Sequence, residues 1–71
     1  MEQWQERVIQ EKKELDEKID KLKKFLGEKV EKVFNVDETE RLRLEVQLTI
    51  MESYSNILKA RITSWSQTSA T

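Results

Sequence analysis

The chain has 71 residues, a formal net charge of −1, and neither cysteine nor histidine. This length allows one domain, residues 1–71, with a small core that cannot be reinforced by disulfides or thiolate zinc sites. The usual nucleophile–base pairs are also missing, so we expect no catalytic residue, metal or cofactor. The balanced charge argues against DNA or RNA polymers as ligands, and no apolar run is long enough to span a membrane. Self-association remains as the source of stability, and we expect a homo-oligomer.

The first third of the chain carries one helical stripe. Its apolar residues recur at three-, four- and seven-residue steps, which predicts a long helix. Gly27 follows "KLKKFL", and a glycine just beyond a stripe with lysines in the last turn is typical of a helix end, although a kink in a continuing helix is the alternative. The stripe contains Val8, Leu15, Ile19, Leu22 and Leu26, and Trp4 extends it.

Residues 27–37 are expected to connect two helices. Within them "EKVEKVF" keeps roughly helical spacing and indicates a short additional helical piece. Asp37, with Glu40 three residues later, resembles a capping box and predicts the start of the next helix.

A second long helix is predicted from about Glu38 to about Thr63. Its apolar sector is wider than one partner helix requires, so part of it should meet another partner. Residues 66–71 are expected to fray. The fold class is therefore all-α, with two long antiparallel helices assembling into a compact homo-oligomer. One stripe contains Leu44, Leu48, Met51, Leu58 and Ile62, and the adjoining strips contain Val46, Ile50, Tyr54 and Ile57.

Trp4 lies close to the N-terminus and has two interpretations. Trp4 and Tyr54 can be interface core, with Arg7 and Arg61 pairing with carboxylates of a neighbouring chain. Alternatively, an aromatic ring can stack on a nucleobase while arginine or lysine holds a phosphate. In a twofold-symmetric oligomer each group occurs twice, and the matching ligand then has two bases and two phosphates.

Two helical stretches have a recognisable pattern, "RVIQEKKELDEKIDKLKKFL" in the first predicted helix and "QLTIMESYSNILKARI" in the second. They resemble a family of small phage proteins, the anti-CBASS cyclic-oligonucleotide sponges (anti-CBASS protein two). CBASS is a bacterial defence in which a cyclic nucleotide switches on a killing effector. The resemblance covers about residues 4–62.

The resemblance implies a homohexamer that holds cyclic dinucleotides between protomers and can bind cyclic trinucleotides at a separate site. For the dinucleotide site it implies Trp4 as the aromatic residue and Lys18 or Lys21 as the lysine, and Arg7 lies one turn from Trp4. Trp4 stands where a tyrosine is expected, which keeps stacking but loses a hydroxyl. For the trinucleotide site it implies Gln5 and Arg61.

The resulting hypothesis is a phage-encoded protein of the host bacterial cytoplasm. It would sequester cyclic oligonucleotides without cleaving them and so block activation of the CBASS effector. The alternative is a structural or regulatory helical hairpin that assembles without a small ligand.

Overall fold

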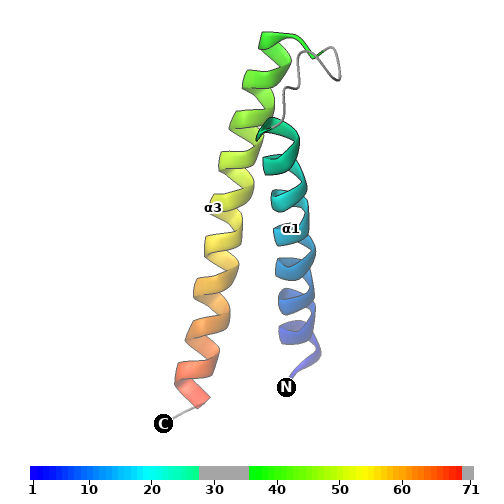
Figure 1. Ribbon diagram of the computed structural model, residues 1–71. Coiled ribbons are helices and arrows are strands. Elements are labelled where there is room, and N and C mark those ends of the chain that lie inside the picture. Colours follow the sequence, from blue (N-terminus) through cyan, green and yellow to red (C-terminus); the bar gives the residue numbers. More distant parts are fainter. Residues whose placement is uncertain (28–35, 70–71) are drawn as a thin grey trace.

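The computed structural model describes residues 1–27 and 36–69, with side chains as far as Trp65. In this part of the chain two helices, α1 (Gln3–Gly27) and α3 (Glu38–Ser69), form an antiparallel hairpin with both termini at one end (Figure 1). The hairpin is elongated, 53 Å long and about 16 by 15 Å across. The predicted all-α class and the helical hairpin are confirmed, whereas assembly stays a prediction.

The start of α1 follows a local capping rule. At the start, the backbone N–H of Glu2 donates to Oε1 of Gln5 at 2.8 Å, which is the reciprocal half of a capping box. At the other end α1 is described as far as Gly27, and because the residues that follow lie outside the described part of the chain, the glycine stop signal stays a prediction. The short helical piece predicted within "EKVEKVF" lies outside the described residues.

Asp37 begins α3 as the sequence predicts. The backbone N–H of Glu40 donates to Oδ1 of Asp37 at 2.8 Å, which satisfies one of the free donors of the first turn. The predicted end near Thr63 is wrong, because α3 continues to Ser69. The reason is Trp65, which packs against Trp4 and extends the contact between the helices beyond Ile62.

The core between the helices is narrow. Among the described residues only Val8, Ile19 and Leu58 are buried apolar side chains, and Leu58 is fully buried. The remaining stripe residues predicted for both helices are half-buried, except Trp4, which is exposed. A two-helix hairpin of this size therefore removes little apolar surface from water. Neither helix, over the described residues, has a stretch long and apolar enough to cross a membrane.

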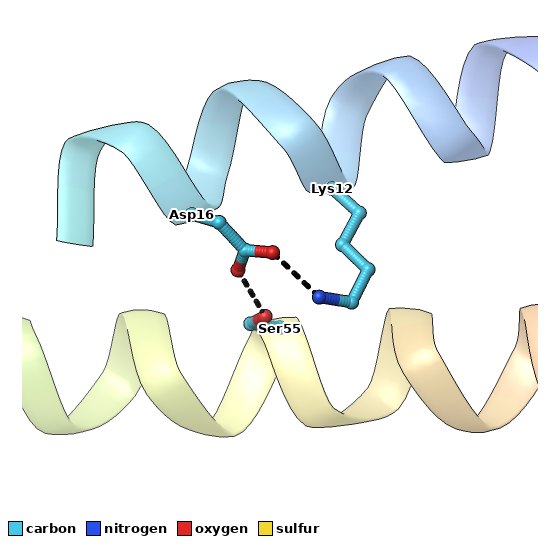
Figure 2. A network of polar contacts seen from close by, with 3 residues as sticks. All are labelled: Lys12, Asp16 and Ser55. Atoms are coloured by element: carbon cyan, nitrogen blue, oxygen red, sulfur yellow. Dashed lines mark hydrogen bonds and ion pairs between the residues drawn. The ribbon is translucent and has the colours of Figure 1, made fainter. Parts of the chain in front are cut away.

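Polar contacts set how the two helices lie against each other. Ser55, buried at the seam, donates from Oγ to Oδ1 of Asp16 at 2.5 Å, and Lys12 Nζ lies 2.6 Å from the other oxygen of the same carboxylate (Figure 2). A second cross-helix pair joins Lys23 and Glu52 at 3.0 Å. Because Ser55 replaces an apolar residue in the α3 stripe, its bond to Asp16 works only in one register.

This network predicts an acid-sensitive contribution to stability. Hydrogen bonds from Lys12 and then Ser55 hold the pKa of Asp16 below its ordinary value of 3.8. The folded state therefore favours the carboxylate, and its stabilising effect is present above that value and lost as pH falls through the lower folded pKa. We expect Asp16→Asn to lose less free energy of unfolding than the parent between about pH 5 and about pH 2.

Urea denaturation across this pH range measures the difference. Asp20→Asn, which removes an exposed carboxylate one turn further along α1, is the matched control and should keep the parent's acid sensitivity. Identical pH profiles for Asp16→Asn and the parent would contradict the role of the network.

Candidate ligand-binding face

The end of the hairpin that carries both termini is marked by two tryptophans. The rings of Trp4 and Trp65 pack edge to face, with centroids 4.8 Å apart and planes at 84°. Trp4 nevertheless keeps 47% of its surface exposed. Such an edge-to-face pair fixes the ring positions and leaves apolar surface open to a further planar group.

A second contact crosses the same side of the seam. The hydroxyl of Tyr54 donates to Oε2 of Glu11. This hydrogen bond, followed by partial desolvation, raises the pKa of Tyr54 above its ordinary value of 10.0, while the positive charge of Arg61 acts weakly in the opposite direction. Arg61 therefore lies close enough to the Tyr54 hydroxyl to influence its ionisation.

These two contacts define what we call the aromatic face. Glu11 and Asp16 are five residues apart and so lie on opposite sides of the buried stripe of α1. The Glu11–Tyr54 contact is therefore on one face of the hairpin, and the Asp16–Ser55 contact is on the other. The side chains that define the aromatic face are Trp4, Glu11, Tyr54, Arg61 and Trp65.

Both arginines predicted for a ligand site lie at the terminal end of this face. Arg7 is exposed on α1 between Trp4 and Glu11, and Arg61 is exposed on α3 between Tyr54 and Trp65. The two tertiary contacts bracket both positions, so α1 and α3 each contribute one guanidinium beside the aromatic rings. The structure thus brings together Trp4, Arg7 and Arg61.

The predicted lysines are not part of this group. Lys18 is exposed and continues the face along α1, but it lies 14 residues beyond Trp4, about 21 Å along the helix axis. Lys21 is also exposed and is one turn further away. Within one chain this separation prevents Trp4 and either lysine from holding the same small ligand. A site that uses both must take them from different copies.

Gln5 has a local structural role and is on the other side of α1. Its side-chain oxygen accepts the backbone N–H of Glu2 and so caps the helix start. Gln5 and Arg7 are two residues apart, so their positions differ by nearly half a turn around the helix axis. Gln5 and Arg61, the pair implied for a trinucleotide site, are therefore not adjacent within one chain.

The grooves of the hairpin lie away from the aromatic face. One, of about 430 Å³, is lined by Asp16, Asp20 and Glu52 together with Lys23, and a neighbouring one of about 490 Å³ includes Ile9 and Ile62. The carboxylates in the first would repel a phosphate. Neither groove includes a predicted site residue, and the described part of the chain holds no cluster of acidic side chains arranged for a metal ion.

Trp65 and Tyr54 are the members of the face that sequence reasoning undervalued. Trp65 was expected near a frayed end, yet it lies seven residues after Leu58 and three after Ile62 and so continues the α3 stripe. That spacing is the sequence signal that could have placed Trp65 in the contact between the helices. Chemically, the face offers three aromatic rings, the guanidinium of Arg61 and the carboxylate of Glu11, and Arg7 adds a second guanidinium at its terminal end; rings and guanidiniums suit a ligand that has both bases and phosphates.

Comparison with protein families matches residues 2–64 to the Sequestin family. The chain belongs to the Sequestin family. The name of this family denotes a sequestering role and is consistent with the cyclic-oligonucleotide sponges that the two helical stretches resemble. No curated protein and no solved structure matches the chain. The match covers most of the hairpin and ends one residue before Trp65.

The contact between Tyr54 and Glu11 can be tested by titration, because Tyr54 is the only tyrosine in the chain. We expect its pKa to lie above 10.0 in the folded protein and to fall towards that value in Glu11→Gln, since the carboxylate favours the neutral phenol. Tyrosinate absorbance in the ultraviolet measures this pKa directly. Glu14→Gln removes a carboxylate one turn away and should leave the titration unchanged. An unshifted parent titration would contradict the contact.

Proposed function

We propose that this member of the Sequestin family binds cyclic oligonucleotides and holds them without cleavage, so that a CBASS effector is not activated. The observation that carries the proposal is the gathering of Trp4, Arg7 and Arg61 at one end of the aromatic face. Rings of this kind stack on nucleobases, and guanidiniums bind phosphate oxygens in pairs. A phage origin and action in the host bacterial cytoplasm follow from the same proposal.

The proposed mechanism is sequestration by mass action. Bound ligand is withdrawn from the free pool, so the number of sites must be comparable to the number of signal molecules. The described residues contain no histidine or cysteine to act as a base or nucleophile, and the binding chemistry described here requires none. The family name supports a sequestering role of this kind.

Completion of the site requires several chains in this proposal. In a single hairpin Lys18 and Lys21 lie too far from Trp4 to share its ligand. Association would bring lysines of one copy to the rings of another and would exclude water from the phosphates. We propose a homo-oligomer, with the hexamer implied by the resemblance as its size.

The direct test is recovery of the ligand. Purified protein is mixed with a labelled cyclic dinucleotide, separated from free ligand by gel filtration, and denatured by heat. A sponge releases the intact ligand, an enzyme returns a linear product, and an assembly module without a ligand retains nothing. The third outcome would favour the alternative function, which the exposed apolar surface of α3 supports equally well.

Trp4 provides the sharpest variant. We expect Trp4→Ala to weaken binding of cyclic dinucleotide by about 1–3 kcal/mol, roughly 5- to 150-fold in Kd, because the stacking surface is lost. Trp4→Phe keeps a ring and should retain most of the affinity. Isothermal titration calorimetry measures both, and light scattering reports the assembly. If Trp4→Ala dissociates the oligomer, Trp4 is interface core and the assignment is wrong.

Arg61 distinguishes one shared surface from two separate sites. The trinucleotide site implied for Gln5 and Arg61 stays a prediction, but Arg61 lies with Trp4 and Arg7 at one end of the face. We therefore expect Arg61→Ala to weaken binding of cyclic di- and trinucleotides alike, by about tenfold or more, because a charge-assisted phosphate contact is lost.

Lys59→Ala is the charge-matched control, because Lys59 is exposed on the opposite side of α3. It should leave both affinities close to the parent's. A loss confined to trinucleotides in Arg61→Ala would contradict the shared surface and favour two sites.

A further inference from the structure

The outer surface of α3 carries an uncharged strip that α1 does not cover. Its large members are Leu42, Val46, Ile50 and Ile57, which are 54%, 59%, 63% and 59% exposed. They recur at steps of four and seven residues and turn away from the stripe that includes the buried Leu58. A continuous aliphatic strip of this kind marks an interaction surface on a protein that is otherwise rich in charge.

The composition of the strip favours an identical strip as its partner. The positions between the aliphatic residues are filled by residues of small or moderate size, and no charged residue interrupts the strip. These smaller residues are Thr49, Ser53 and Ala60. An acidic or basic partner helix would leave its charges unpaired against such a surface. A second copy presents aliphatic and small residues only, so no buried charge arises in the contact.

The order of side-chain sizes also specifies a direction. Ser53 is at the centre, with an isoleucine on each side at about one turn, Ile50 and Ile57. The residue seven positions before Ser53 is the larger Val46, and the residue seven positions after it is the smaller Ala60. When two copies are antiparallel about Ser53, each valine meets an alanine and the isoleucines interdigitate, which fills space and permits close approach.

We propose that two copies of this chain pair through the outer surfaces of α3, antiparallel, with a twofold axis at Ser53. The proposal concerns the surface and the register and goes beyond self-association as such. It stands on the exposure and pattern of the strip and does not depend on any ligand.

One consequence connects this pair to the aromatic face, and it rests on the proposed function. Arg43 and Arg61 are 18 residues apart, five turns of helix, and so border the strip on the same side. In the antiparallel pair Arg43 of one copy comes level, within about 3 Å along the axis, with Arg61 of the other. Two guanidiniums so placed repel each other unless an anion lies between them, and a phosphate of the cyclic ligand would fill that position.

The register can be tested by cysteine cross-linking, because the chain contains no cysteine of its own. Ser53→Cys should form a disulfide-linked dimer on mild oxidation, since the axis places this residue opposite itself. Val46→Cys should not cross-link with itself but should cross-link when mixed with Ala60→Cys. Lys59→Cys, on the opposite side of α3, is the control and should stay uncross-linked at the same protein concentration.

Each alternative result overturns the proposal. Self-linking of both Ser53→Cys and Val46→Cys would indicate parallel pairing. Absence of cross-links at all three strip positions, with the parent multimeric in sedimentation, would show that the strip faces another surface. As a second measurement, Ile50→Glu should shift the sedimentation of the protein to a smaller particle while its helical circular dichroism persists, and an unchanged particle would also overturn the proposal.

The ligand part has its own readout. Arg43→Ala should weaken binding of cyclic dinucleotide by about tenfold. The double variant that combines Ser53→Cys with Arg43→Ala should still form the disulfide-linked dimer. Unchanged binding with intact cross-linking would remove Arg43 from the site and leave the pairing in place. If the parent retains no cyclic nucleotide but Ser53→Cys cross-links, the proposed function fails and the pairing stands.

Discussion

A helix can bury only one stripe against one partner, and this constraint underlies the structure. α1 has a single apolar stripe, whereas α3 has one stripe in the seam and a second on its outer surface. The seam itself closes over few buried apolar side chains, and one of its central positions is a serine that needs Asp16 as its partner. The hairpin is therefore well defined in register but modest in buried area, and its remaining apolar surface is directed outwards.

The same arrangement organises the charged and aromatic groups. Seam contacts on one side involve Asp16, Lys12 and Ser55, and those on the other side involve Glu11, Tyr54 and the two tryptophans. The carboxylates of the groove on the first side would repel an anionic ligand, whereas the second side carries Arg7 and Arg61. The chain belongs to the Sequestin family, and in the proposed function this face holds a cyclic oligonucleotide.

Local signals in the sequence were sufficient for the helices. Asp37 caps α3 as predicted, and the capping pattern was readable because it depends on interactions within a few residues. The end of α3 was predicted too early, because it depends on Trp65 meeting Trp4 across the hairpin. Likewise, helical spacing placed Arg7 and Arg61 on their helices, but only the antiparallel register shows that they lie at the same end of one face.

The distance between Trp4 and the lysines could also be estimated from their spacing in the sequence. That these residues cannot share a ligand within one chain follows only once α1 is known to be one continuous helix from Trp4 to the lysines. A straight α1 keeps Lys18 about 21 Å from Trp4, so a shared ligand requires several chains. Native mass spectrometry of the protein with a cyclic dinucleotide tests this claim most directly. The account predicts intact ligand on multi-chain particles only, in a constant ratio with fewer ligands than chains. Full-affinity binding to a single chain would contradict it.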